Sequence, residues 1–215
     1  MRVVAFVPIK LTNQRLPGKN LMPLAGKPLC QHIFETLLRV QGIDEVFAYC
    51  SDEKLCDFLP KGVRFLQRDA RLDGDLVKGA QIYDEFLNDV DADVYILAHA
   101  TSPFVKAESI KKGLDAVLSG CHDSAFAAER IQTFAWFKGG PLNYPLADVP
   151  RTQDIEPVWI ETSAFYVFRR AVFESQGQRI GSTPFLVETD GLENVDIDEP
   201  RDYEMARLMV GDRDK

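Results

Sequence analysis

Short apolar runs alternate with longer amphipathic segments along most of this 215-residue chain, and the alternation restricts the folds that are open to it. Strand-length runs separated by helix-length segments are typical of an α/β fold, in which a mostly parallel central sheet carries flanking helices. Strands are predicted for residues 2–9, 45–50, 64–67, 94–98, 124–129, 162–168 and 185–188. Helices are predicted for residues 29–40, 53–59, 76–90, 107–119, 170–176 and 200–210.

One segment, residues 131–160, does not follow the alternation. It contains several prolines and the aromatic residues Phe134, Trp136, Phe137, Tyr144 and Trp159. So much aromatic surface outside a predicted sheet indicates either a lid over a ligand or a subunit interface. No domain linker interrupts the chain, and 46% hydrophobic residues are enough to bury one core. We therefore predict a single domain, residues 1–215, with an excursion at 131–160.

The overall composition disfavours several classes of function. The formal net charge is -8 and the pI is near 5.0, whereas a nucleic-acid surface requires a broad basic face. No stretch approaches the ~20 apolar residues of a membrane span, and Met1 is followed directly by strand-like sequence. We expect a cytoplasmic protein without nucleic-acid or membrane partners. The cysteines lack C-x-x-C spacing, which predicts free thiols and not a zinc site, at Cys30, Cys50, Cys56 and Cys121.

A local excess of positive charge follows the first predicted strand. Between Lys10 and Lys27 there are four cationic side chains and no carboxylate, on a chain that is acidic overall. An open α/β sheet binds its ligands at the carboxyl ends of its strands, so this loop indicates an anionic ligand such as a nucleotide triphosphate. The loop is not of the Walker type, because Gly18 and Lys19 are followed by Asn20 and not by Ser or Thr.

Two carboxylates lie close together near the other end of the chain. Asp196 and Asp198 have a spacing of two, which places both side chains on one side of an extended segment. Mg²⁺ commonly takes one or two protein carboxylates and completes its coordination with water and phosphate oxygens. The pair therefore predicts a magnesium site, and the alternative is that Asp198 caps a helix while Asp196 is solvated.

Polar residues also follow other predicted strands. His99, Thr101 and Ser102 come directly after residues 94–98, at the ligand side of the sheet, where they could contact a ligand or form a turn. Arg68 and Arg71 follow residues 64–67. Arginine suits bidentate contact with phosphate, but salt bridges to Asp69 or Asp73 explain these two equally well.

A third group of polar residues brackets the aromatic excursion. Arg151 and Gln153 offer a cation and an amide to a substrate carboxylate, and Glu161 lies at the end of the excursion. The alternative is a polar hairpin tip.

Several of these motifs together resemble a known family. Residues 10–28, especially 15–20 and 24–28, are similar to the signature loop of the acylneuraminate (CMP-sialate) cytidylyltransferases. The similarity continues in the same order at residues 101–103, 150–154, 164–166 and 196–198, so it spans nearly the whole chain. The resemblance implies a Rossmann-like nucleotide-diphospho-sugar transferase fold, CTP as substrate, and Mg²⁺ as cofactor. It also implies attack of an acceptor oxygen on the α-phosphate, release of pyrophosphate, and a homodimer formed through the excursion.

The resemblance also suggests roles for individual residues. The catalytic group would be Arg15, Lys19 and Asp198. Nucleotide binding would involve Pro8, Lys10, Arg15, Lys19, Asn20, Arg68 and Asp75. The anionic sugar or phosphate acceptor would contact His99, Thr101, Ser102, Arg151, Gln153 and Glu161. The metal would be held by Asp196 and Asp198.

The sequence departs from the family pattern at two places. Residues 9–14 contain no glycine, although the family has a glycine-containing run there, and glycine lets a loop turn its amides toward phosphate. His99 stands where the family usually has glutamine. The acceptor therefore stays open among a nonulosonate, an octulosonate, a phosphorylated polyol and a small phosphate or phosphonate. A non-catalytic nucleotide-binding module is the rival from another class.

Overall fold

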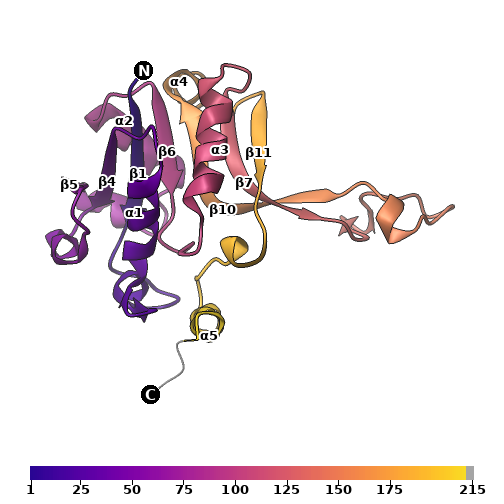
Figure 1. The fold of residues 1–215 in the computed structure, drawn as a ribbon, viewed down its shortest axis with the longest axis horizontal. Helices are drawn as coiled ribbons and strands as arrows, with labels where there is room; N and C mark the ends of the chain where they lie inside the picture. The colour runs from indigo at the N-terminus through magenta and orange to yellow at the C-terminus, as the bar shows by residue number, and fades with distance from the viewer. Residues whose placement is uncertain (212–215) are drawn as a thin grey trace.

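The computed structural model describes residues 1–211, which form a seven-stranded sheet with helices on both faces (Figure 1). The strand order is β11, β7, β10, β6, β1, β4 and β5. Among these, β10 runs antiparallel to β6 and β7, and the other pairs are parallel, as the predicted mostly parallel sheet requires. The bounds are β1 Val3–Ile9, β4 Glu45–Cys50, β5 Val63–Gln67, β6 Val94–Ala98, β7 Ser124–Ile131, β10 Val158–Arg169 and β11 Pro184–Glu188.

Alternating side chains of the central strands form a separate hydrophobic cluster on each face of the sheet. In β1, Val3 and Ala5 pack in the cluster that contains α1 and α3, whereas Val4 and Phe6 pack in the cluster that contains α2 and α4. Phe6 stacks on Phe86 of α2 with ring centroids 4.1 Å apart. The helices span α1 Leu29–Arg39, α2 Gly79–Asp89, α3 Ala107–Leu118, α4 Arg170–Gln176 and α5 Pro200–Met209. None of the helices within residues 1–211 is both long and apolar enough to cross a membrane.

A third hydrophobic cluster joins two segments that are far apart in the sequence. The loop after β1 contains a short helix, η1 (Lys19–Leu21), and a small hairpin of β2 (Pro23–Leu24) and β3 (Lys27–Pro28). The C-terminal segment and α5 pack against this loop. The buried members are Leu16, Leu24, Leu29, Ile197, Tyr203 and Ala206. This packing places the acidic segment around residue 198 beside the cationic loop.

The excursion is an arm that projects from the body of the protein (Figure 1). Strands β7 and β10 continue beyond the rest of the sheet and pair as far as Ile131 and Val158. Strand prediction stopped short of these ends because the exposed part of the arm carries polar residues such as Arg130 and Glu161, which interrupt the apolar runs. Between the strands lie β8 (Trp136–Phe137), β9 (Gly140–Pro141) and η4 (Thr152–Asp154).

Two helix predictions need correction. Residues 53–59 form a 3₁₀ helix, η2 (Glu53–Phe58), because Pro60 follows at once and disfavours continuation of an α-helix. Helix α2 begins at Gly79 and not at residue 76, since Leu76 is 96% exposed in the turn that precedes the helix. The other predicted helices end within one residue of the observed bounds.

Candidate functional site

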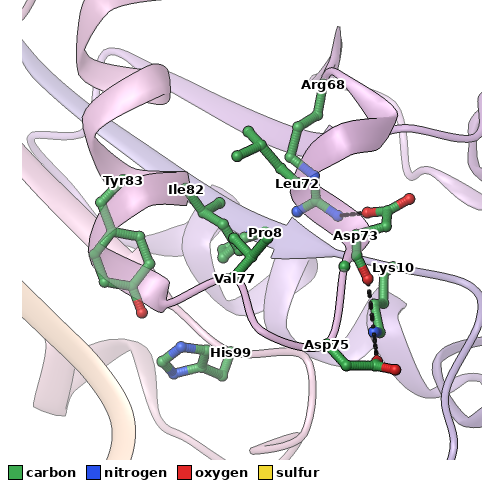
Figure 2. A pocket seen from close by; sticks show the side chains of 11 residues that line it. Pro8, Lys10, Arg68, Leu72, Asp73, Asp75, Val77, Ile82, Tyr83 and His99 are labelled. Atoms are coloured by element: carbon green, nitrogen blue, oxygen red, sulfur yellow. Dashed lines mark hydrogen bonds and ion pairs between the residues drawn. The ribbon is translucent and has the colours of Figure 1, made fainter.

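Two adjoining cavities open at the carboxyl edge of β1 and β6. The first, of about 340 Å³, is lined at one end by Arg68 and Asp73 and at the other by Tyr83 and His99 (Figure 2). The second, of about 320 Å³, is lined by the loop after β1 and by Asp198. Lys10 and Asp75 line both cavities, so the two adjoin, and together they are called the cleft below. Pro8, at the end of β1, lines the first.

The centre of the second cavity is a carboxylate held by two cations. Asp198 accepts from Lys19 Nζ at 2.7 Å and forms an ion pair with Arg15 Nη2, also at 2.7 Å. Burial by itself would raise the pKa of Asp198, but hydrogen bonds and charge from Lys19 and Arg15 outweigh it, and the pKa lies below its usual value. The predicted catalytic residues Arg15, Lys19 and Asp198 therefore meet in space, and Asp198 is ionised at neutral pH.

The loop holds Lys19 in a fixed position. Gly18 has a φ of 69°, in the left-handed region, and starts η1 directly before Lys19. Lys19 is buried, and its Nζ also donates to the Ile197 carbonyl at 3.1 Å. The side-chain amide of Asn20 is buried and donates to the Lys10 carbonyl at 2.9 Å. Asn20 is predicted to bind nucleotide, but it lines neither cavity. Its hydrogen bond to Lys10 instead stabilises the conformation of the loop.

Side chains of the glycine-free segment bridge the two cavities through Asp75. Lys10 Nζ donates to Asp75 at 3.3 Å and to the Asp73 carbonyl at 3.0 Å, and Gln14 donates to Asp75 at 2.6 Å. These contacts join the loop after β1 to the turn before α2. The segment thus presents amino and amide groups to the cleft, where a glycine-rich loop would present backbone amides.

The predicted metal pair is arranged unequally. Asp198 lines the second cavity, whereas Asp196 accepts a hydrogen bond from the Thr101 hydroxyl. Although Asp196 is exposed as a residue, its carboxylate lies in a partly desolvated position, and this raises its pKa. Thr101 also accepts from the Ile197 amide at 2.8 Å through its carbonyl, so it ties the acidic segment to the end of β6. No group of three or more metal-ligating side chains occurs within residues 1–211, but Mg²⁺ needs only one or two carboxylates.

The two arginines after β5 have different roles. Arg68 is buried, lines the first cavity, and forms an ion pair with Asp73. It also lies over the ring of Tyr49, 5.8 Å from the centroid. Arg71, in the short helix η3 (Ala70–Asp73), is instead paired with Asp69 and Glu85 at the surface. The alternative that salt bridges explain these arginines therefore holds for Arg71. Arg68 forms a salt bridge and also lines the cavity.

His99 is held at the opposite end of the first cavity by an irregularity in β10. A β-bulge between Glu161 and Tyr166 leaves Ser163 with a φ of 60°, and its carbonyl accepts from His99 Nδ1. Burial is the main cause that lowers the pKa of His99, so its imidazole is neutral at pH 7. Nδ1 must carry the ring proton, because it donates to the Ser163 carbonyl. In the neutral ring, Nε2 is then unprotonated and can accept a hydrogen bond. Ser102 is buried and donates its backbone amide to the His99 carbonyl at 3.2 Å.

The remaining predicted acceptor residues lie on the arm or at its base. Arg151 pairs with Asp154 at 2.7 Å, and Gln153 accepts from Gln132 through its carbonyl, both near η4. Neither lines the cleft of its own chain. Glu161, at the base of the arm, accepts from the Tyr166 hydroxyl at 2.9 Å.

Sequence reasoning missed three residues at this end of the cleft. Tyr83 lines the first cavity from α2, and Tyr166 forms an edge-on contact with His99, with centroids 6.3 Å apart. Arg179 lies over Tyr166, 3.9 Å from its ring centroid. Tyr83 has the pattern of an ordinary core position, Tyr166 was noted only as part of the motif at 164–166 without a role, and Arg179 falls in a loop without a recognisable motif, so the folded geometry is what places them together.

Comparison with known proteins bears on this site. The family model described as "Cytidylyltransferase" matches residues 4–206. The 3-deoxy-manno-octulosonate cytidylyltransferase of Escherichia coli is 25% identical over 87% of this chain and 80% of that protein. The N-acylneuraminate cytidylyltransferases of Oncorhynchus mykiss and of Streptococcus agalactiae serotype III (strain NEM316) are 26% and 22% identical, over 97% and 94% of this chain. The chain spans about half the length of these last two proteins, 50% and 52%.

Solved structures show the same fold. The structure of CMP:2-keto-3-deoxy-manno-octonic acid synthetase complexed with CTP aligns with a TM-score of 0.71 at 20% identity, and covers 99% of this chain and 100% of that chain. The 4-diphosphocytidyl-2C-methyl-D-erythritol synthase from Anaerococcus prevotii DSM 20548 aligns with a TM-score of 0.68 at 12% identity, over 98% and 96% of the two chains. Since the family match extends over nearly all of the described residues, the chain belongs to the cytidylyltransferase family of nucleotidyltransferases.

Proposed function

We propose that this protein transfers CMP from CTP to an acidic sugar and releases pyrophosphate. The observation that carries the proposal is the meeting of Arg15, Lys19 and Asp198 in the second cavity, which adjoins the first. The cationic loop suits a polyanion, and the first cavity leaves room for a base and an acceptor. The motif resemblance favours a sialic-acid-like nonulosonate as acceptor, and the relative from E. coli favours an octulosonate.

The triphosphate would lie along the second cavity. Arg15 and Lys19 would neutralise the negative charge that develops on the α-phosphate and on the departing pyrophosphate. Lys10 would contact the nucleotide where the two cavities join, and Arg68 would lie beside the base. An oxygen of the acceptor forms a bond to the α-phosphorus, and the bond from that phosphorus to the bridging oxygen of pyrophosphate breaks.

The donor set fits Mg²⁺. Asp198 is ionised, its oxygens face the second cavity, and Asp196 lies two residues earlier in the same segment. These two carboxylates would hold the ion, which when bound neutralises phosphate charge. The contacts of Arg15 and Lys19 with Asp198 keep all three side chains in place before the nucleotide arrives.

His99 would act on the acceptor. Its neutral ring has Nε2 free to accept, at the end of the first cavity farthest from Arg68 (Figure 2). A hydrogen bond from the attacking hydroxyl to Nε2 would orient the acceptor oxygen. Nε2 would then receive the hydroxyl proton as the oxygen forms its bond to phosphorus.

The function is tested by measuring pyrophosphate release from CTP and Mg²⁺ with a panel of acceptors: N-acetylneuraminate, 3-deoxy-manno-octulosonate, a phosphorylated polyol and a phosphonate. We expect turnover with an acidic sugar, none without acceptor, and loss of turnover with EDTA. A CTP concentration 100-fold above Kd should stabilise the fold by roughly 2.7 kcal/mol. Stabilisation by CTP without turnover on any acceptor would instead favour a non-catalytic nucleotide-binding module.

The arm supports a homodimer as the working assembly. Its exposed apolar side chains include Trp136, Phe137 and Leu146, which are 56%, 63% and 61% exposed. Such a set on a projecting hairpin suits burial against a second copy, in which Arg151 and Gln153 would reach the partner's cleft. We expect light scattering to give a dimer mass for the wild type and a monomer mass for the double variant Trp136→Ser/Phe137→Ser. A monomeric wild type would contradict this assembly.

A further inference from the structure

Arg179 contacts Tyr83 and Tyr166 beside the end of the cleft that His99 lines, and within residues 1–211 it has no carboxylate partner. It lies in the loop between α4 and β11, half-buried, with its guanidinium 3.9 Å from the ring centroid of Tyr166. Its Nη1 donates weakly to the Tyr83 hydroxyl at 3.4 Å. Its Nε is buried and has no hydrogen-bond partner. Within residues 1–211 no ion pair is formed by Arg179, whereas Arg15, Lys19 and Arg68 are each paired with an aspartate.

An unpaired guanidinium in this position is costly unless an anion joins it. Removing a cation from water carries a penalty that a ring contact offsets only in part, since a cation–π contact contributes on the order of 0.5–2 kcal/mol. Stacking on Tyr166 fixes the plane of the guanidinium, and the hydroxyls of Tyr83 and Tyr166 take only part of its N–H groups. The remaining N–H groups, among them Nε, can donate to an anionic group.

The surroundings of Arg179 belong to the cleft. Tyr83, which accepts from Arg179, lines the first cavity together with His99. Burial is the main cause of the lowered pKa of His99, and the charge of Arg179 lowers it further. Helix α2 is adapted to this arrangement at Gly79, where a Cβ atom would lie 2.7 Å from the Tyr83 hydroxyl.

We propose that Arg179 is a specificity-determining residue that binds an anionic group of the acceptor, a carboxylate or a phosphate oxyanion. This rests on the proposed nucleotidyl transfer. The phosphates of CTP already have Arg15 and Lys19 at the other end of the cleft, so the cation beside Tyr83 and His99 is left for the second anion. Glu161, held by the Tyr166 hydroxyl at 2.9 Å, offers an acceptor oxygen to sugar hydroxyls nearby.

The test is a cycle that combines a change in the protein with a change in the acceptor. Wild type, Arg179→Gln and Arg179→Lys are assayed with the acceptor that the wild type uses and with its uncharged counterpart, the methyl ester of a carboxylate or the dephosphorylated form of a phosphate. Lys61→Gln is the matched control, because it removes one exposed positive charge from the loop before β5. CTP-dependent thermal stabilisation shows whether each variant is folded and binds nucleotide.

We expect Arg179→Gln to raise the KM for the charged acceptor by about 10- to 100-fold, with KM for CTP within about 3-fold of wild type. The wild type should prefer the charged acceptor over its uncharged counterpart by a similar factor, and Arg179→Gln should lose that preference. Arg179→Lys should retain part of it, and Lys61→Gln all of it. The proposal is wrong if Arg179→Gln keeps the full preference for the charged acceptor. This is the result expected if the effect of the Arg179→Gln substitution and the effect of removing the acceptor charge are independent, so that their fold-changes simply multiply. A wild type without turnover on any acceptor refutes the proposed function instead, before Arg179 is tested.

Discussion

The cations at the two ends of the cleft have different partners. At the end formed by the loop after β1, Arg15 and Lys19 both form ion pairs with Asp198, which offsets part of their positive charge. At the other end, Arg179 lies against Tyr83 and Tyr166, and the described residues supply it with aromatic rings but with no carboxylate.

The proposed function assigns a different ligand to each end. On the proposed function, a carboxylate beside two cations suits a ligand that brings a metal ion together with its phosphates, because Asp198 would hold the ion and the two cations would bind the phosphates. A cation against aromatic rings suits a ligand with a single anionic group and no metal. If both proposals hold, one cleft would distinguish a nucleotide from its acceptor by the partners that it provides to similar cations.

The largest effect should follow from breaking the paired end. Asp198→Asn removes the charge but not the shape, and Arg15→Ala removes a side chain that is 63% exposed. Each should lower turnover by about 10²- to 10³-fold, because Arg15→Ala removes a cation that would neutralise the reacting phosphates and Asp198→Asn removes a carboxylate charge that would hold Mg²⁺. Steady-state kinetics over a range of Mg²⁺ concentrations measures this, and Asp198→Asn alone should require more Mg²⁺.

A surface variant controls for the general loss of a charge. Asp115→Asn breaks an exposed ion pair with Lys111 on α3. Neither residue lines either cavity, so this variant should leave turnover unchanged. Arg15→Ala should keep the wild-type circular dichroism. Full activity of Arg15→Ala and Asp198→Asn would remove the basis for assigning catalysis to this end.

The fold was largely predictable from the sequence, because buried strands and amphipathic helices leave strong patterns. Residues 45–50 and 94–98 were predicted with the observed bounds, since residues 46–50 and 94–98 are unbroken apolar runs buried in the sheet. The arm was recognised as an exception to the alternation but not as two long strands. Its strand ends are solvent-exposed and stabilised by pairing with each other, which local apolar patterns do not record.

The paired end of the cleft was also predictable, and the Arg179 end was not. Arg15 and Lys19 stand out as cations without nearby carboxylates in the sequence, and Asp196 and Asp198 stand out by their spacing. Arg179 is one of many surface-type residues in a loop, and its importance arises from contacts with Tyr83 and Tyr166, 96 and 13 positions away. Such contacts depend on how α2 and β10 pack, which no local pattern encodes.

The smallest effect concerns His99, which lines the same end of the cleft as Tyr83. Burial lowers its pKa, so below about pH 6.5 the unfolded chain binds a proton that the folded chain still excludes. Stability from this residue is therefore present above about pH 6.5 and is lost as the pH falls through the lower, folded-state pKa. His99→Gln keeps an amide donor for the Ser163 carbonyl but cannot titrate. Between about pH 7 and pH 5, we expect the Tm of wild type to fall by a few degrees more than that of His99→Gln.

Two further measurements separate His99 from other titrating groups. His32 also has a lowered pKa, mainly because of burial, so His32→Gln should flatten the same stability curve while leaving acceptor kinetics unchanged. His99→Gln should in addition lower kcat, because the amide cannot receive the acceptor proton at the position of Nε2. The acidic limb of the wild-type pH profile should then lie below about pH 6.5, and it should disappear in His99→Gln. An unchanged acidic limb would mean that a different group sets the protonation requirement, and His99 would then serve only to hold the bulge at Ser163 against the end of β6.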